Sequence, residues 1–289
     1  MIACRLADTH VYLIHYIKPM LRLAIAGAAG RMGQTLLQVV SAHPDFTVSS
    51  AMLRVGHHKL GQTAVFETSA EAASEKTDSV CYGTTVTEDT QCLIDFTAPD
   101  YTLSLLPNCV ASKIPCVIGT TGFESKQLEE LHKCALEIPV LLAPNTSLGV
   151  NLMLGLLKMA AKAIGEQADI EIVEAHHRNK LDSPSGTALR MGEVIADTLG
   201  HSMSDVAIYG REGRADQARP QNQIGFSTLR AGDIIGDHSV LFALDGEQIE
   251  ISHRANSREL FAKGALRAAE WLVVQPPGLY GMDDVLGLK

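Results

Sequence analysis

The sequence predicts an α/β protein with a Rossmann-like parallel sheet domain and a second, α+β domain with a mixed sheet. Three observations indicate this fold: a β-α-β unit around a glycine-rich turn over 21–53, further strands separated by helices up to residue 146, and long β segments over 222–255. Strands that alternate with helices favour parallel pairing, because a crossover helix then connects them. The 289 residues suffice for about two domains.

The first domain is predicted from alternating apolar and helical stretches. A strand over 21–26 and a helix over 31–42 precede a strand over 46–53, and a polar stretch over 54–89 interrupts the alternation. Further strands are predicted over 92–96, 114–118 and 139–143, with helices over 101–112 and 125–136 between them.

The pattern changes after residue 146. We expect an α+β domain over 147–257, inserted between a nucleotide-type α/β domain over 20–146 and a C-terminal segment, 258–289, that returns to it. The predicted elements of the insert are helices over 148–164 and 187–199, a strand over 170–175, and β segments over 222–255 that turn near 231–232 and 245–246; a last helix is predicted over 258–274.

Composition excludes several classes of protein. The 33 acidic and 24 basic side chains give a formal charge of -9, which disfavours nucleic acid or an anionic membrane as a partner. No segment reaches the roughly 18 uninterrupted apolar residues of a membrane span. Residues 1–19 lack the features of a signal peptide and are expected to be an N-terminal appendage. Six cysteines without a C-x-x-C pair favour reduced thiols in a cytoplasmic protein over a disulfide or zinc framework.

A glycine-rich turn between the first predicted strand and helix predicts dinucleotide binding. In that position glycines let the backbone approach a pyrophosphate at the helix N-terminus. The spacing is G-x-x-G-x-x-G, which departs from the commoner G-x-G-x-x-G, and a turn that serves packing alone is the other interpretation. The predicted cofactor contacts are Gly27, Ala28, Ala29, Gly30, Arg31 and Met32.

The end of the second predicted strand bears on the choice of cofactor. Sites for NAD usually place an acidic residue there for the ribose 2′-hydroxyl, whereas this chain has Leu53 followed by Arg54. Arg54 is suited to pair with a 2′-phosphate, and Arg31 adds a second cation. We therefore expect NADPH to be preferred over NADH; the other interpretation of Arg54 is a solvated loop residue.

Two more turns follow predicted strands and so fall at the carboxyl edge of the sheet, where α/β proteins bind ligands. Their small and hydroxyl side chains suit a nicotinamide ring and its ribose, although singly they are ordinary turn residues. The candidates are Gly119, Thr120 and Thr121 in one turn, and Ala143, Pro144, Asn145 and Thr146 in the other.

The segment 174–187 concentrates histidines, cations and a Ser-Gly-Thr turn between a strand and a helix. Ser185, Gly186 and Thr187 would open that helix and present N–H and hydroxyl groups to an anion such as a substrate carboxylate. Lys180 offers a cation and a proton, and a histidine that titrates near neutrality takes the complementary role. The structural alternative is a polar loop with a capped helix.

The adjacent histidines, His176 and His177, raise the alternative of a metal site. Adjacent residues on an extended backbone point to opposite sides, and no third ligand is spaced nearby. We therefore expect no metal.

Together these motifs resemble those of the bacterial dihydrodipicolinate reductase (4-hydroxy-tetrahydrodipicolinate reductase) family. The strongest is Glu-Ala-His-His-x-x-Lys-x-Asp-x-Pro-Ser-Gly-Thr-Ala over 174–188. The glycine turn, Ile-Asp-Phe-Thr over 94–97, Val-Ile-Gly-Thr-Thr-Gly-Phe over 117–123, Asn151, and Arg-Ala-Gly-Asp-Ile-Ile-Gly over 230–236 have family counterparts in the same order. The sequence departs from the better-known enteric members at Leu53, which replaces an acidic ribose ligand, and at Thr146, where an aromatic residue is often found.

The resemblance implies an activity: NAD(P)H-dependent reduction of 4-hydroxy-tetrahydrodipicolinate or dihydrodipicolinate to tetrahydrodipicolinate in lysine and diaminopimelate biosynthesis, by hydride transfer to C4. It implies that His176 donates or accepts a proton and that Lys180 donates one. His177, with Gly186 and Thr187, is implied to bind the cyclic dicarboxylate substrate. The α/β domain would then bind the dinucleotide, and the inserted domain would bind substrate and assemble a homotetramer.

Two alternatives remain open. A different two-domain nicotinamide oxidoreductase, such as an amino-acid or semialdehyde dehydrogenase, shares the glycine turn but is not expected to have His-His-x-x-Lys followed by Pro-Ser-Gly-Thr. A catalytically silent dinucleotide sensor has no need of matched proton donors beside a carboxylate site.

Overall fold

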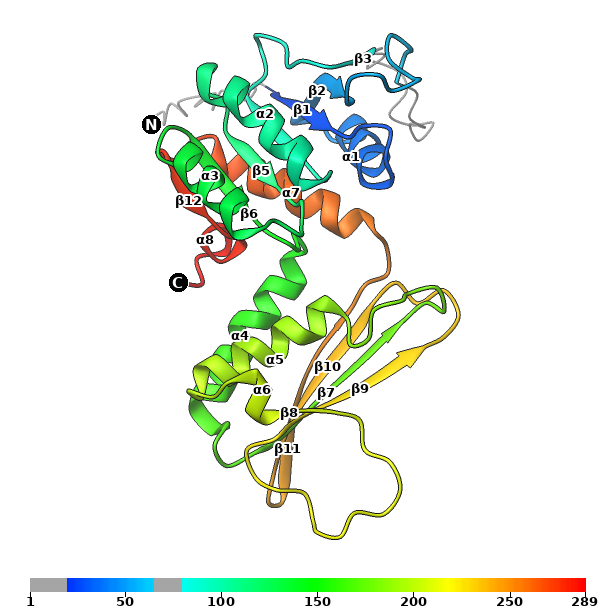
Figure 1. The fold of residues 1–289 in the computed structure, drawn as a ribbon, viewed down its shortest axis with the longest axis vertical. Coiled ribbons are helices and arrows are strands. Elements are labelled where there is room, and N and C mark those ends of the chain that lie inside the picture. The colour runs from blue at the N-terminus through cyan, green and yellow to red at the C-terminus, as the bar shows by residue number, and fades with distance from the viewer. Residues whose placement is uncertain (1–19, 65–79) are drawn as a thin grey trace, which may run out of the picture.

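The structure is a computed structural model that describes residues 20–64 and 80–289. The expected appendage, residues 1–19, lies outside the described residues. Figure 1 shows two bodies, each built on one sheet, and the chain passes between them at 143–147 and 255–258. One sheet is parallel and flanked by helices and the other is mixed, so the predicted fold class is confirmed.

The first sheet is parallel throughout, in the order β12-β6-β5-β4-β1-β2-β3. On β1, Leu23 and Ile25 face one helical layer while Ala24 and Ala26 face the other, because side chains alternate along a strand. Burial on both faces accounts for the nearly continuous apolar runs of these strands. The strands are β1 (Leu21–Ala26), β2 (Phe46–Met52), β3 (Tyr82–Gly83), β4 (Cys92–Asp95), β5 (Cys116–Ile118), β6 (Pro139–Leu142) and β12 (Gly278–Tyr280).

Helices cover both faces of this sheet. Two apolar cores result, one under α1, α7 and α8 and one under α2 and α3. Helix α2 begins two residues before the predicted start, because the fixed φ of Pro99 suits the first helical position. The helices are α1 (Arg31–Ser41), α2 (Pro99–Ala111), α3 (Ser125–Ala135), α7 (Glu259–Leu272) and α8 (Met282–Leu286).

The second sheet is mixed, in the order β11-β10-β7-β9-β8. Strand β7 pairs antiparallel with β10 and parallel with β9. Figure 1 shows α4, α5 and α6 on one side of this sheet, where Leu157, Ile172 and Phe242 form part of its core. The elements are α4 (Leu148–Ile164), β7 (Asp169–His176), α5 (Gly186–Thr198), α6 (Met203–Val206), β8 (Ala207–Tyr209), β9 (Ile224–Arg230), β10 (Asp237–Leu244) and β11 (Glu247–Arg254).

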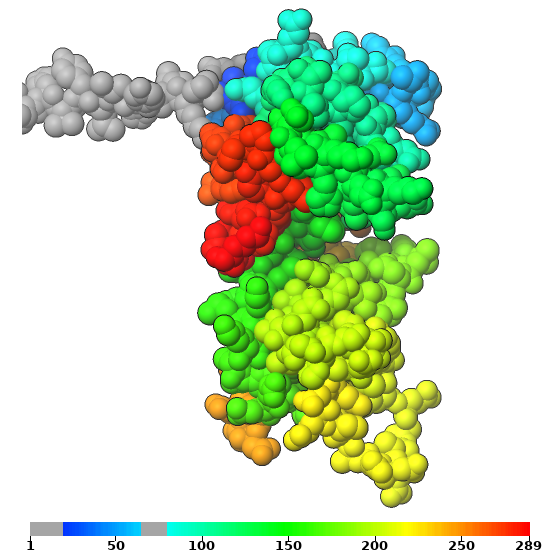
Figure 2. Space-filling model, turned by 60° about the vertical axis from the view of Figure 1, so that its left-hand side comes forward, coloured from blue at the N-terminus to red at the C-terminus, as the bar shows by residue number. Residues whose placement is uncertain are grey.

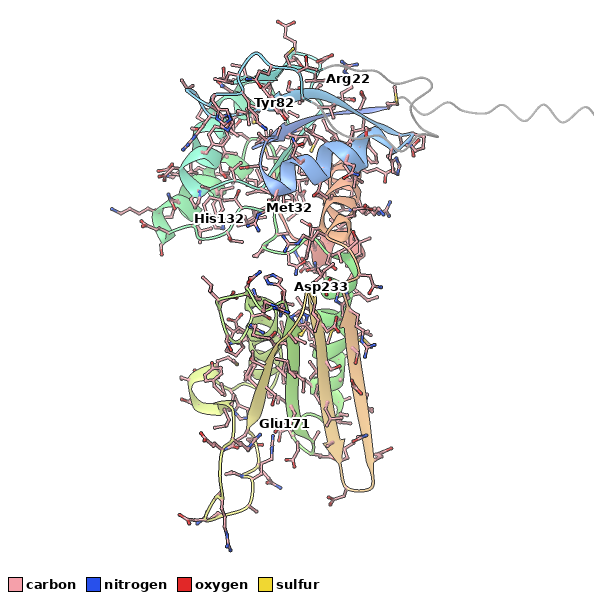
Figure 3. All side chains as sticks on the ribbon, turned by 90° about the vertical axis from the view of Figure 1, so that its right-hand side faces the viewer. Arg22, Met32, Tyr82, His132, Glu171 and Asp233 are labelled. Carbon is pink, nitrogen blue, oxygen red and sulfur yellow. The ribbon has the colours of Figure 1, made fainter. Side chains whose placement is uncertain are left out.

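The carboxyl edge of the parallel sheet faces the end of the second sheet at which β7 and β9 end and β10 begins. Met32, in the first turn of α1, lies on the side of the first body that faces the second, and Asp233, between β9 and β10, lies at the opposing end of the second sheet (Figure 3). Glu171, early in β7, lies farther from the first body (Figure 3). Figure 2 shows the molecular surface hollowed where the two bodies meet. Among the helices of 20–64 and 80–289, none is long and apolar enough to cross a membrane.

Candidate active site

A groove of about 820 Å³ lies where the two bodies meet. A hydrogen bond joins its two sides: Asn145 Nδ2 donates to Thr187 Oγ1 at 3.4 Å. The structure thus brings together residues that the sequence places at two separate predicted sites. Of the predicted residues, Thr121, Ala143, Pro144 and Asn145 line it from the first body, and His176, Lys180, Ser185, Gly186 and Thr187 line it from the second.

The glycine-rich turn lies between β1 and α1, at the carboxyl edge of the first sheet. Gly27 has φ +66°, and a Cβ there would lie 2.5 Å from Thr97 Cγ2, so glycine is required at this position. The Gly30 N–H donates to the Gly27 carbonyl at 2.8 Å and closes the turn. No side chain caps α1 and its first turn holds no acidic residue, so its leading N–H groups fit an anionic pyrophosphate.

The end of β2 has one buried and one exposed residue. Leu53 is buried in the core, and its N–H donates to the Gly83 carbonyl at 2.8 Å. Arg54 is exposed, as is Arg31 across the same edge of the sheet. The side chain of Leu53 therefore serves packing, while the two guanidinium groups are accessible to a ligand.

Between these turns, a buried carboxylate organises the ends of β4 and β5. Asp95, which is fully buried, accepts hydrogen bonds from Thr97 Oγ1 at 2.6 Å and Thr102 Oγ1 at 2.5 Å. The Thr97 N–H donates to Thr120 Oγ1 at 2.9 Å. Thr120 is thus a buried member of this network, whereas its neighbour Thr121 is exposed at the groove.

In the turn after β6, the side chain of one predicted cofactor contact does not line the groove. Thr146 is fully buried, and its hydroxyl donates to the Phe261 carbonyl in α7 at 2.7 Å. It is not among the groove's lining residues. Its side chain therefore fastens the crossing between the two bodies, and the predicted contact with a nicotinamide ring would fall to its backbone.

In the second body, His176 ends β7 and is held by Glu174 on the same face of the strand. His176 Nδ1 lies 2.6 Å from Glu174 Oε2. Because an ionised carboxylate only accepts hydrogen bonds, Nδ1 carries the proton and Nε2 is the ring nitrogen left for a ligand. A Cβ at Gly236 would lie 3.0 Å from Nε2, so the absence of a side chain there leaves room beside this atom.

Burial and the neighbouring charges together determine the protonation state of His176. Burial lowers the pKa of His176, the carboxylate of Glu174 raises it, and the charges of Lys180 and Arg230 lower it; the net result is a lowered pKa. Burial alone would raise the pKa of Glu174, but hydrogen bonds from Arg230, His176 and the Ser185 N–H hold it below its ordinary value. His176 is therefore neutral and Glu174 ionised at neutral pH.

The loop after β7 supplies the cation and the helix start. Lys180 Nζ lies 2.9 Å from Asp182 Oδ2, and this hydrogen bond lowers the pKa of Asp182. Ser185 caps α5 by accepting the Ala188 N–H at 3.1 Å. The predicted substrate residue His177 is half-buried and is not among the groove's lining residues.

Other parts of the predicted set also lie outside this groove. The glycine turn (27–32), Arg54, Gly119 and Thr120 follow the same edge of the first sheet but are not among its lining residues. Within the part of the chain that the structure describes, no group of three or more His, Cys, Asp or Glu side chains is arranged to hold a metal ion.

Sequence reasoning missed three polar residues of the site, Glu174, Arg230 and His238. Arg230 donates to both oxygens of Glu174 at 2.8 Å, and His238 Nε2 lies 3.1 Å from Ser185 Oγ. Glu174 had a usable signal, since residues two apart on a strand share a face and His176 was already a candidate. Arg230 begins the segment 230–236 that resembles the family, but its contact with Glu174 and the position of His238 depend on the pairing of β7 with β9 and β10, which is a long-range feature.

Comparisons with known proteins identify the same family for both bodies of the chain. Models of the dihydrodipicolinate reductase N-terminus and C-terminus match residues 21–146 and 149–286. A 4-hydroxy-tetrahydrodipicolinate reductase of Methylococcus capsulatus is 50% identical over 269 residues, covering 93% of this chain and 99% of the relative. One of Hahella chejuensis is 48% identical over 272 residues, covering 93% and 100%.

A solved structure supports the fold. The dipicolinate-bound dihydrodipicolinate reductase of Paenisporosarcina sp. TG-14 has a TM-score of 0.71, with 23% identity over 92% of this chain and 99% of that one. At that identity the likeness concerns the fold, while the family models and the relatives near 50% identity carry the assignment. The chain belongs to the dihydrodipicolinate reductase family of oxidoreductases.

Proposed function

We propose that this chain reduces 4-hydroxy-tetrahydrodipicolinate, or its dehydrated form, to tetrahydrodipicolinate in lysine biosynthesis, with NADPH preferred over NADH. The observation that carries the proposal is the groove itself, in which the turn after β6 meets the start of α5 through the Asn145–Thr187 hydrogen bond. A cofactor bound along the first sheet and a dicarboxylate bound at α5 would meet there.

The first body holds the cofactor in this proposal. The glycine turn and the uncapped start of α1 would receive the pyrophosphate, and Arg54 with Arg31 would pair with a 2′-phosphate. Thr121 and the turn 143–145 would lie beside the nicotinamide. When bound, the reduced nicotinamide supplies the hydride.

The second body holds the substrate. Gly186 and Thr187 form the first turn of α5, whose N–H groups and positive helix end favour a carboxylate. Lys180, 22% exposed at its side chain, adds a cation at the same groove. A cyclic dicarboxylate therefore meets complementary charge from two neighbouring segments. The expected role of His177 in binding it stays a prediction, with the side chain outside the groove's lining.

We assign the proton transfers to different atoms of the site. In neutral His176 the Nδ1–H is engaged in a hydrogen bond to Glu174, so Nε2 has no proton to donate and acts as a hydrogen-bond acceptor. Lys180 carries ammonium protons at the groove and donates to the charge that reduction leaves on the substrate's conjugated system. Of the two roles that the resemblance leaves open for His176, donor and acceptor, this proposal chooses the acceptor, and it keeps Lys180 as the donor.

We also propose a cytoplasmic homotetramer built through the second sheet. The face of this sheet opposite α4 and α5 presents Val173 and Leu229, which are 38% and 51% exposed. Apolar side chains on an open sheet face are typical of a surface that a second copy covers. Light scattering on the eluting protein should give four times the chain mass of 31.0 kDa, and a monomer mass would contradict the assembly.

The test of the proposed function is product formation. Purified protein, NADPH and substrate made freshly from pyruvate and aspartate semialdehyde should yield tetrahydrodipicolinate by mass spectrometry. Dipicolinate, the planar dicarboxylate named with the Paenisporosarcina structure, should compete with the substrate. Cofactor oxidation without this product would point to another oxidoreductase, and cofactor binding without oxidation would point to a sensor.

A further inference from the structure

Glu174 connects two parts of the site that come from different segments. Its side chain is only 1% exposed and ends in the interior of the second body. Through Oε2 it holds Nδ1 of His176 at 2.6 Å, and through Oε1 it accepts the Ser185 N–H at 3.0 Å. One carboxylate therefore fixes both the histidine at the end of β7 and the residue that caps α5.

Arg230 holds this carboxylate from the neighbouring strand. In the pairing of β7 with β9, Arg230 is the partner of His176, two residues beyond the partner of Glu174. Its Nη1 and Nη2 donate to the two oxygens of Glu174 at 2.8 Å each, which is the bidentate geometry that arginine supplies and lysine does not. Nη2 also donates to the Asp182 carbonyl at 2.5 Å, so Arg230 ties down the loop that carries Lys180.

The pair has an electrostatic consequence for His176. A buried carboxylate 2.6 Å from an imidazole favours the imidazolium, whereas a guanidinium bound to the same carboxylate offsets its charge. Two other titratable groups face His176. They are Lys180 in the loop after β7, which is paired with Asp182, and His238 on β10, whose ring centroid lies 5.1 Å from that of His176.

We propose that Glu174 and Arg230 act as one positioning unit for the reduction. Glu174 sets the ring orientation of His176 and the start of α5 together, and Arg230 offsets the charge of Glu174 beside His176 while it anchors the Lys180 loop. The identity of the ligand rests on the proposed function, but the positioning does not. Neither residue lines the groove, so both act through others.

Stability alone does not explain why the Glu174–Arg230 ion pair is withdrawn from water. Taking two charges out of water costs several kcal/mol per ion, and well-packed apolar residues often replace such pairs without loss. Here each charge instead has a defined acceptor or donor in the site, including the Ser185 N–H and the Asp182 carbonyl. A positioning role accounts for that set of partners.

The electrostatic part of the proposal is tested by measuring the pKa of His176 with NMR of ring-labelled histidine. The signal of His176 is assigned by comparison with a His176→Asn variant. Arg230→Gln leaves Glu174 uncompensated, so the pKa of His176 should rise. Glu174→Gln removes the carboxylate charge, so the same pKa should fall. A general loosening of the structure would not shift the pKa of His176 in opposite directions in the two variants. Arg219→Gln is the matched control, because Arg219 pairs with Asp169 and Glu171 on the same strand, and it should leave His176 unchanged.

The positioning half is tested by dipicolinate binding to the full chain, measured by calorimetry with NADPH present. Arg230→Lys keeps a positive charge beside Glu174 but cannot reproduce its paired hydrogen bonds. It should keep the His176 pKa near that of the unmodified protein and weaken dipicolinate binding at least about ten-fold, the order of a lost charged hydrogen bond. This variant also serves if Arg230→Gln fails to fold.

Two results would each overturn the proposal: an unchanged or lower His176 pKa in folded Arg230→Gln, or unmodified dipicolinate affinity in Arg230→Lys. Neither readout requires turnover. Failure of the proposed function would appear separately, as an unmodified protein that binds NADPH and does not form product.

Discussion

Asn145 Nδ2 donates to Thr187 Oγ1 at 3.4 Å, so the turn after β6 and the first turn of α5 are in direct contact across the groove. Residues 42 positions apart, from two bodies with separate cores, therefore meet at the site. The crossing beside them is packed closely: a Cβ at Gly264 in α7 would lie 1.8 Å from the Thr146 carbonyl oxygen. The geometry of the site thus depends on how α7 supports the crossing segment.

Gly264→Ala should destabilise the protein. Glycine to alanine in a helix ordinarily gains up to about 1 kcal/mol, but the new methyl group would overlap the Thr146 carbonyl, and overpacking costs about 1–3 kcal/mol. Urea denaturation should show a lower free energy of unfolding. Gly155→Ala is the matched control in α4, since its Cβ meets only the flexible end of Leu288 at 3.2 Å and should be tolerated. Equal stabilities of the two variants would contradict the close packing.

Lys180→Ala should lower kcat about 100 to 1000-fold, the usual effect of removing one donor that stabilises developing charge. Cofactor affinity should change little, because Lys180 lies in the second body, beside Asp182. Stopped-flow turnover and NADPH fluorescence titration measure the two quantities. Lys113→Ala is a control for loss of a comparable pair, Lys113–Glu137 at 3.1 Å. Near-normal turnover in Lys180→Ala would remove Lys180 from the proton transfer.

The fold was largely predictable because its core strands are apolar and its crossovers are amphipathic. Burial on both faces of β1 explains why 21–26 is recognisable as a strand. Strands β3, β8 and β12 have two or three residues each, too few for any periodicity, and each is an edge strand that pairs with a single neighbour. Strand β12, for example, is held by its parallel pairing with β6 near the end of the chain.

The candidate site was predictable where a local motif carried it. Ser185 caps α5 as its position before Gly-Thr indicates, and the glycine turn has the positive φ that its sequence requires. The contact of Arg230 with Glu174 was not predictable, since the two residues lie 56 positions apart and approach each other only through the register of β9 on β7. For Thr146 the predicted cofactor contact stays a prediction, but the motif did not indicate that its side chain points into the packing against α7.

Arg54→Ala should reduce the preference for NADPH. Loss of a charge-assisted bond to a 2′-phosphate costs about 1.5–3 kcal/mol, so kcat/KM with NADPH should fall roughly ten-fold or more while the value with NADH stays the same. NADH is thus an internal control within one variant. Because Leu53 is buried, an acidic residue there would disturb the core rather than restore a ribose contact. Equal losses with both cofactors would contradict the 2′-phosphate assignment.

His238 should make stability depend on pH. Burial lowers its pKa to about 4, below its unfolded value of about 6.5. Since the unfolded chain binds the proton more tightly, the stability contribution is complete above pH 6.5 and is lost as pH falls toward 4, by about 3 kcal/mol at most. Urea denaturation of His238→Gln between pH 7 and pH 4.5 should show a shallower loss than the unmodified protein. Parallel curves for the two proteins would exclude this role.

The most direct test of the proposed function is the decay of NADPH absorbance after substrate is added to the purified protein. The substrate is made freshly by the upstream synthase from pyruvate and aspartate semialdehyde. The same measurement is made separately with NADH. We predict turnover with both cofactors, faster with NADPH than with NADH when each is supplied at the same low concentration, and inhibition by dipicolinate. Measurable cofactor binding with no oxidation of either cofactor would contradict it.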